Sequence, residues 1–322
     1  MIANCLGINE AGHLEISGCD TVRLAEQYGT PLYVMSEDEI RSVCRRYVAS
    51  FAKNYNGNGK PIYASKAFSC KEIYRIVLSE GLDVEVVSGG ELYTALQAGV
   101  PGSQIHFQGN NKSAGELTMA VENGVGDIVV DNLYELERLN AIAGEHSMVA
   151  PISFRIKPGI DAHTHEFIRT GQVDSKFGLD LASGEAMEAL RRAKAMEHVA
   201  VKGLHCHIGS QILEKAPFVH AAEVMLQFYA KVRDELGMAF EHLNLGGGFG
   251  IHYTAQDDAI PYEEYMEDVS AMVHSTCEKL GLELPRIYIE PGRSIVGEAG
   301  ITLYTVGAIK EIPGVRTYVA VD

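Results

Sequence analysis

Eight short apolar runs rich in β-branched residues alternate with longer stretches in which apolar residues recur at helical spacing. Runs of this kind predict buried strands, and the stretches between them predict amphipathic helices. Such alternation favours a parallel sheet, and eight units over about 250 residues match a (β/α)8 barrel. The predicted strands span residues 61–65, 83–87, 104–108, 127–131, 151–157, 199–208, 241–245 and 286–290.

Two other arrangements fit parts of this pattern. A doubly wound open sheet uses the same alternation of strands and helices and is the main structural alternative. A leucine-rich solenoid would keep a fixed repeat, and the first four runs do begin about 22 residues apart. That spacing is lost after the fourth run, and no repeated asparagine pattern accompanies it. The sequence therefore favours an α/β fold with a TIM-like (β/α)8 barrel.

The two ends of the chain differ from this alternation. Residues 13–35 predict a strand, a short helix and a second strand, whereas 300–312 and 316–322 predict two further strands. We therefore expect residues 1–35 to contribute to a β domain, residues 36–296 to form the barrel, and residues 297–322 to begin the C-terminal part of that β domain. Because the last predicted strand has no closing turn, we expect the β domain to be partial.

Composition narrows the class of ligand. The formal net charge of −16 and the pI of about 5.2 disfavour nucleic acid, because the average surface field would repel a polyanion. Small molecules are therefore the expected partners. The six cysteines form no CxxC pair, no signal-peptide pattern begins the chain, and no apolar run approaches the roughly 18 residues of a membrane span. These features predict a reduced, cytoplasmic protein without a membrane segment.

Polar residues and glycines follow every predicted barrel strand. The carboxyl ends of barrel strands meet at one face, where the active sites of such barrels lie. Lys66 is distinctive among them, because a primary amine can condense with an aldehyde and so hold a cofactor covalently. The residues expected at this face are Lys66, Ser88–Gly90, Gly109–Asn111, Asp131, Arg155, Lys157, His207, Gly209, Ser210, Gly246–Gly248, Glu290 and Arg293.

Two glycine-containing segments, GGGFG (246–250) and EPGR (290–293), follow the seventh and eighth predicted strands. Glycines permit a tight turn whose backbone N–H groups point at one anion, and barrels often hold phosphate at these two loops. A purely structural glycine turn is the alternative. Ser210 and Arg293 are expected to converge on the same place, which favours a phosphate site.

His205 and His207 lie two residues apart on a predicted strand and so share one face. A zinc site would need three or four converging ligands, and the nearest other histidines, His163 and His165, have no matching spacing. We therefore predict no metal. A hydrogen-bonded position inside the barrel is expected for His205, whereas His207 at the rim can lie flat against a planar cofactor.

Glu290, at the end of the eighth strand, indicates the type of reaction. A carboxylate beside a pyridine nitrogen stabilises the protonated ring, which then becomes a strong electron sink. An amino acid that loses CO2 or a proton leaves a carbanion that needs such a sink. An ordinary salt bridge is the alternative role for Glu290.

Together these features resemble the fold type III pyridoxal phosphate (PLP) decarboxylases, which include ornithine and diaminopimelate decarboxylases and have alanine racemase as a more distant relative. The resemblance covers almost the whole chain and is strongest to the diaminopimelate decarboxylase group. Eight ordered motifs carry it: YASKAF (63–68), VEVVSGGEL (84–92), FQGNNKS (107–113), DAHTHEF (161–167), DSKFG (174–178), HCHIGSQ (205–211), NLGGGFG (244–250) and EPGRS (290–294).

The resemblance implies three catalytic residues. Lys66 would hold PLP covalently, His207 would stack on its ring, and Glu290 would meet the pyridine nitrogen, where alanine racemase places an arginine. Arg293 would face the phosphate or a substrate carboxylate, and Lys176 would belong to a dimer contact. The other residues that the resemblance places around the cofactor are Ser210, Gly247, Gly248, Pro291 and Gly292 at the phosphate, with Arg155 and Glu85 near the ring.

The reaction that the resemblance implies is decarboxylation of meso-2,6-diaminopimelate to L-lysine and CO2, the last step of lysine biosynthesis. Another decarboxylase of the family, acting on ornithine, arginine or carboxynorspermidine, and a non-catalytic PLP-binding regulator are the alternatives. Family members are homodimers with shared active sites, and a β domain beyond the position of Asp322 gives a cysteine and a tyrosine to the partner's site. We therefore expect this chain to be incomplete as a catalyst on its own.

Overall fold

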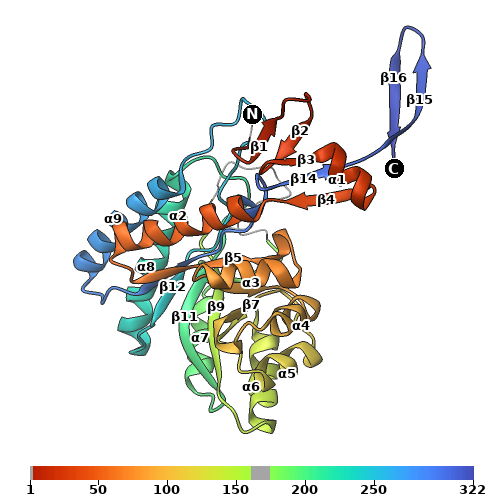
Figure 1. Cartoon of the computed structure of the whole chain (residues 1–322). Coiled ribbons are helices and arrows are strands. Elements are labelled where there is room, and N and C mark those ends of the chain that lie inside the picture. The colour runs from red at the N-terminus through yellow and green to blue at the C-terminus, as the bar shows by residue number, and fades with distance from the viewer. Residues whose placement is uncertain (1–2, 161–174) are drawn as a thin grey trace.

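A closed parallel barrel forms the centre of the computed structural model, which describes residues 3–160 and 175–322 (Figure 1). Its strands pair in the order β5-β6-β7-β8-β9-β11-β12-β13, and β13 pairs again with β5. This closure excludes the open sheet and confirms the (β/α)8 barrel. The strands are β5 (Gly59–Ala64), β6 (Asp83–Val86), β7 (Ile105–Phe107), β8 (Asp127–Val130), β9 (Ala150–Lys157), β11 (Val199–Cys206), β12 (His242–Asn244) and β13 (Arg286–Ile289).

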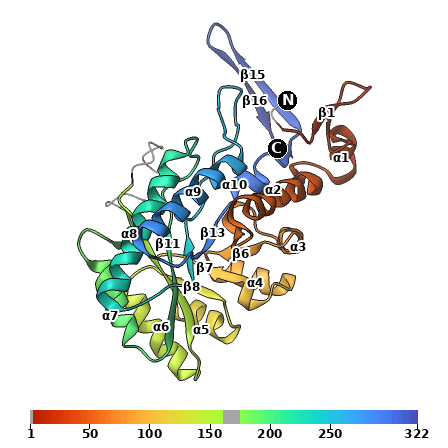
Figure 2. The ribbon, with the colours of Figure 1, turned by 90° about the vertical axis from the view of Figure 1, so that its left-hand side faces the viewer.

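Helices surround the barrel on its outside (Figure 1 and Figure 2). In α2 (Glu37–Tyr55), Ile40, Val43 and Tyr47 recur at helical spacing and are buried, while the Ser36 side chain caps the first turn. The same amphipathic pattern packs the other helices against the strands. They are α3 (Lys71–Ser79), α4 (Gly89–Ala98), α5 (Ala114–Glu122), α6 (Leu133–Glu145), α7 (Glu185–Lys194), α8 (Ala216–Leu236) and α9 (Tyr262–Leu280).

Polar and apolar side chains alternate along the barrel strands. On β6, Val84 and Val86 belong to the apolar core between strands and helices, whereas Asp83 and Glu85 alternate with them in sequence and are also buried. Because successive side chains of a strand point to opposite faces, the buried polar residues of seven strands or their ends, all but β5, meet inside the barrel. They form two layers, a floor layer (Asp83, His106, Asp127, Ser153 and His242) and an upper layer (Glu85, Gln108, Arg155, His205, Asn244 and Glu290).

Asp127 is the centre of the floor layer. Its Oδ2 accepts a hydrogen bond from Ser153 Oγ at 2.9 Å and lies 3.5 Å from His106 Nδ1 and 3.4 Å from His242 Nε2. Burial opposes its charge, but the two histidines outweigh burial and lower the pKa of Asp127 strongly. Burial likewise opposes a charge on His106, but Asp127 and Asp83 raise the pKa of His106 to about 9. Mutually compensating charges therefore hold the floor of the barrel together.

Segments from both ends of the chain pair beside the barrel. β4 (Leu32–Met35) runs antiparallel to β14 (Gly300–Leu303). A small antiparallel sheet next to α1 (Thr21–Tyr28) contains β1 (Leu6–Ile8), β2 (Leu14–Ile16) and β3 (Cys19–Asp20). The hairpin of β15 (Val306–Ile312) and β16 (Arg316–Val321) extends away from the barrel (Figure 1). β-Structure built from both termini is thus confirmed.

The single strand predicted over residues 300–312 was wrong in extent. The chain forms two strands there, because β14 pairs with β4 whereas β15 pairs with β16, and they separate at Tyr304 and Thr305. The short strands β1, β3 and β10 (Leu179–Asp180) were not predicted, since two or three residues carry no periodic signal. Among the described helices, none combines the length and the apolar character that crossing a membrane requires.

We predict that the floor layer makes stability depend on pH. Because folding raises the pKa of His106, this histidine contributes fully to stability below about pH 6.5, the pKa of a histidine in the unfolded chain. The contribution is lost as the pH rises through about 9. The lowered pKa of Asp127 adds stability above about pH 4 that is lost as the pH falls further. The free energy of unfolding in urea should be lower at about pH 10 than at about pH 6, by about 1–3 kcal/mol.

The His106→Asn variant should lose most of this difference. His220→Asn is the matched control, because His220 lies on α8 with 60% of its side chain exposed. If the His106 variant kept the full pH dependence between about pH 6 and pH 10, the floor layer would not be its source.

Candidate active site

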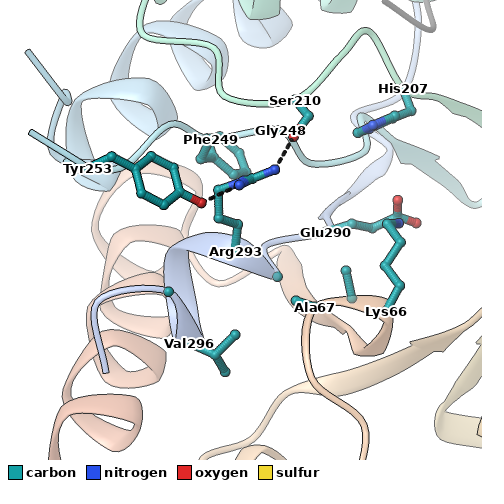
Figure 3. A pocket seen from close by; sticks show the side chains of 13 residues that line it. Lys66, Ala67, His207, Ser210, Gly248, Phe249, Tyr253, Glu290, Arg293 and Val296 are labelled. Carbon is teal, nitrogen blue, oxygen red and sulfur yellow. Dashed lines mark hydrogen bonds between the residues drawn. The ribbon is translucent and has the colours of Figure 1, made fainter. Parts of the chain in front are cut away.

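A cavity of about 400 Å³ opens at the carboxyl ends of the barrel strands (Figure 3). This volume is within the range of pockets that hold small ligands. Gly247, Pro291 and Arg155, which were predicted to contact a cofactor, do not line the cavity. The predicted residues that do line it are Lys66, His207, Ser210, Gly248, Glu290, Gly292 and Arg293.

Lys66 projects into the cavity from a single helical turn, Ser65–Ala67, that follows β5 (Figure 3). Half of its side chain is exposed, and its Nζ donates to both carboxylate oxygens of Glu85, at 2.9 and 3.3 Å. Withdrawal from water lowers the pKa of Lys66, but Glu85 and Glu290 outweigh this effect and raise it. Burial raises the pKa of Glu85, although Lys66 opposes the rise. Glu85 is therefore placed to take the proton that the amine must lose to become a nucleophile.

Glu290 follows β13, and only 4% of its surface is exposed. Gln108 and Asn244 donate to its Oε1, the latter at 2.7 Å, and His205 Nε2 lies 3.1 Å from its Oε2. Burial favours the neutral acid, but the neighbouring His205 and Lys66 outweigh it and lower the pKa of Glu290 to about 2. The group that faces the cavity is therefore a buried, ionised carboxylate.

His207 presents a neutral ring to the cavity. The Gly247 N–H donates to His207 Nδ1 at 3.2 Å, so Nδ1 is the nitrogen without a hydrogen. Burial, together with the positive charges of Lys66 and Arg155, lowers the pKa of His207 well below its ordinary value. Gly247 thus fixes the orientation of this ring.

Arg293 begins the short helix α10 (Arg293–Val296) and extends along the cavity (Figure 3). Its guanidinium donates to Ser210 Oγ at 3.0 Å and to the Tyr253 hydroxyl. Beside these groups, a Cβ on Gly248, where φ is +107°, would lie only 2.2 Å from the carbonyl oxygen of Gly209. A guanidinium, a hydroxyl and a glycine turn with no room for side chains form an arrangement suited to an anion.

Three other residues singled out from the sequence, Arg155, Lys176 and Pro291, do not line the cavity. Arg155, on β9, is buried, and its guanidinium carbon lies 4.2 Å from the centroid of the Phe177 ring. Lys176 Nζ lies 5.1 Å from the same centroid. The Pro291 carbonyl accepts from the Ala64 N–H and so ties the loop after β13 to the end of β5.

The structure places His205 inside the barrel with a hydrogen-bonding partner, as predicted. Within residues 3–160 and 175–322, no group of three His, Cys, Asp or Glu side chains is arranged to hold a metal ion. His163 and His165, with the whole DAHTHEF motif, lie outside the described residues.

Three polar residues of the site were missed by the sequence analysis, namely Gln108, Asn244 and Tyr253. Gln108 and Asn244 stand at strand ends, and following the inward-facing positions from strand to strand would have assigned both to the barrel interior. Tyr253 lies in the loop after the glycine turn, where no local pattern signals its contact with Arg293.

Known proteins are similar to this chain in sequence and in fold. The family model described as pyridoxal-dependent decarboxylase, pyridoxal binding domain, matches residues 37–297. Diaminopimelate decarboxylase of Bacillus subtilis (strain 168) is 49% identical over 314 residues, covering 98% of this chain and 71% of that protein. Diaminopimelate decarboxylase of Mycobacterium tuberculosis (strain ATCC 25618 / H37Rv) is 44% identical over 322 residues, covering 98% of this chain and 71% of that protein.

Solved structures agree with the sequence matches. Diaminopimelate decarboxylase from M. jannaschii, in co-complex with L-lysine, superimposes with a TM-score of 0.90 at 38% identity, covering 100% of this chain and 74% of that one. The enzyme from Helicobacter pylori complexed with L-lysine gives a TM-score of 0.84 at 31% identity, covering 94% and 73%. From its sequence, its fold and the residues of its cavity, this chain belongs to the pyridoxal-dependent decarboxylase family.

Proposed function

We propose that this protein decarboxylates meso-2,6-diaminopimelate to L-lysine and CO2 with PLP as cofactor. The observation that carries the proposal is the convergence of the Lys66 amine and the buried, ionised Glu290 on one cavity. Several relatives between 43% and 49% identical are named diaminopimelate decarboxylase, and structural neighbours from M. jannaschii and Helicobacter pylori were solved with L-lysine bound. Both kinds of match support this substrate over others of the family.

The residues of the cavity fit PLP. Lys66 offers the amine that binds an aldehyde, and Glu290 offers a negative charge to a pyridinium nitrogen. The neutral, fixed ring of His207 offers a flat surface, and Ser210, Gly248 and Arg293 offer donors to a phosphate. When bound, PLP supplies the electron sink that loss of CO2 from an amino acid requires.

The chain's own groups have separate tasks in this reaction. Glu85 receives the proton that Lys66 Nζ gives up, since the two groups are in direct contact. Glu290 holds a proton on the cofactor's ring nitrogen by remaining charged itself. His207, held by the glycine turn, would position the cofactor ring, and Arg293 would balance negative charge at the other end of the cavity.

We further propose that residues 36–296 form the PLP-binding barrel, with residues 1–35 and 297–322 contributing to one β domain. The pairing of β4 with β14 supports a unit built from both termini. A homodimer with shared active sites is proposed from the family resemblance. The exposed apolar side chains of the β15–β16 hairpin, such as Val306, Ile309 and Val319, support an additional contact there.

Turnover of meso-diaminopimelate by the full-length protein tests the substrate. We expect release of CO2 with equimolar L-lysine, and a kcat/KM at least about 100-fold above that for ornithine or arginine. Both of these amino acids lack the distal carboxylate of meso-diaminopimelate, so donors that pair with this carboxylate would be left unpaired. Preference for ornithine or arginine would indicate that the protein is a different decarboxylase of the same family. Binding of PLP without turnover of any of the three amino acids would favour the regulator.

Replacement of Lys66 by Ala tests the covalent site. Borohydride reduction followed by peptide mass mapping should find a pyridoxyl group on Lys66 in the unmodified protein and none in the variant. The variant should still unfold cooperatively, because Lys66 is half exposed and Glu85 can take up a proton once the cation is gone. Lys71→Ala, an exposed position on α3, is the control that should keep the adduct. An adduct on any other lysine would contradict the assignment.

Replacement of Gly248 by Ala tests the glycine turn. The added methyl group would lie 2.2 Å from the Gly209 carbonyl, so the turn must move, and we expect PLP to bind at least about tenfold more weakly and the free energy of unfolding to fall by about 2 kcal/mol. Gly115→Ala on α5 is the matched control, since its Cβ would meet no atom within 4 Å. Spectroscopic titration with PLP and urea unfolding measure both effects, and equal affinities in the two variants would refute this role.

A further inference from the structure

Glu290 is held by three side chains that come from three different barrel strands or their ends. Gln108 follows β7, His205 lies on β11 and Asn244 ends β12, and each is buried. The orientation of Asn244 is fixed, because its Oδ1 accepts from the Gly246 N–H at 2.9 Å while its Nδ2 donates to Glu290. The carboxylate is therefore enclosed by donors that the barrel itself positions.

The contact between His205 and Glu290 determines which ring nitrogen of His205 carries hydrogen. A carboxylate oxygen can only accept, so the Nε2 that lies 3.1 Å from Glu290 Oε2 must be the donor. The amide nitrogen of Gln108 also lies 3.1 Å from this Nε2, but it donates to Glu290 Oε1 and cannot donate to a protonated nitrogen. His205 Nδ1 is buried without a hydrogen-bond partner among the described residues, so Nε2 makes the one hydrogen bond of this ring.

The two oxygens of Glu290 differ in their remaining capacity to accept. Oε1 already accepts from both Gln108 and Asn244, which occupies its two lone pairs. Among the described residues, Oε2 accepts from His205 alone and retains one lone pair. A ring nitrogen that meets Glu290 from the cavity would therefore use Oε2, the same atom that His205 contacts.

We propose that His205 is a positioning residue that, by donating from Nε2 to Glu290 Oε2, keeps Glu290 ionised and so leaves the shared proton on the ring nitrogen of the cofactor. This inference rests on the proposed function. A hydrogen bond to the charged form of an acid stabilises that form, and without it the proton moves toward Glu290. The electron sink then weakens although Glu290 itself is still present.

The test compares variants of His205 in the PLP-loaded, full-length protein. His205→Leu removes the donor while still filling most of the space of the imidazole, and His205→Gln retains an N–H donor. PLP labelled with nitrogen-15 in its ring reports directly where the proton lies. We expect His205→Leu to shift the nitrogen-15 resonance toward that of the unprotonated ring, which Glu290→Gln supplies as a reference, and to lower kcat about ten- to hundredfold with KM changed less than about threefold.

His205→Gln should restore both the resonance and most of kcat. Leu204→Val is the matched control, because Leu204 is buried on the same strand and faces the apolar core, away from Glu290. It should lower the thermal midpoint without moving the resonance. Should His205→Leu not fold, His205→Met replaces it, with the same expected shift.

An unshifted resonance in a folded His205→Leu or His205→Met protein would overturn the inference, even if kcat fell. Equal effects of His205→Leu and His205→Gln would also overturn it, since only one of them lacks a donor. Loss of the proposed function itself has a different signature. In that case the unmodified protein would carry no PLP on Lys66 or would release no CO2, before any change at position 205.

Discussion

Charge buried inside the barrel is the constraint on which the rest of this structure depends. A charge withdrawn from water costs several kcal/mol unless hydrogen bonds and an opposite charge compensate it. Here each compensating group comes from another strand: Asp127 on β8 is met by His106 on β7 and His242 on β12, and Glu290 after β13 is met by His205 on β11. The closed sheet and its polar interior therefore stabilise each other, because neither set of contacts forms without the strands in register.

The two polar layers have different consequences. In the floor layer, opposite charges are paired within the protein, so its contribution is to stability. At the upper layer, Glu290 faces a cavity together with Lys66 from the turn after β5, so their charges are available to a ligand. The same inward alternation along each strand thus provides a stabilising network at one end of the barrel and a reactive one at the other.

The glycine turn Gly246–Gly250 connects the parts of the site. Gly246 donates to Asn244 and accepts from the Glu290 N–H at 2.8 Å, while Gly247 orients His207. A Cβ on Gly247 would lie 2.0 Å from the Glu290 carbonyl, so side chains are excluded there. One backbone segment therefore holds the carboxylate and the histidine ring, and it stands beside the groups suited to an anion. A displacement of this turn would therefore disturb the Glu290 carboxylate, the His207 ring and the groups suited to an anion.

The sequence alone determined the barrel and the identity of the residues at its rim. The alternation of apolar runs with helical stretches is a local property, and the carboxyl ends of parallel strands must share a face. For this reason Lys66, His207, Ser210 and Glu290 could be grouped from the strand pattern by itself.

The tertiary structure decided what those groups contact. No local sequence pattern indicates that Gln108 and Asn244 contact Glu290, or that Glu85 contacts Lys66. The pairing of β14 with β4 has no local signal either. All these contacts join residues at least 19 positions apart in the chain. The protonation states of Glu290 and His207 depend on the same distant contacts. Burial and neighbouring charges set whether these two side chains are charged, and both exist only in the folded chain.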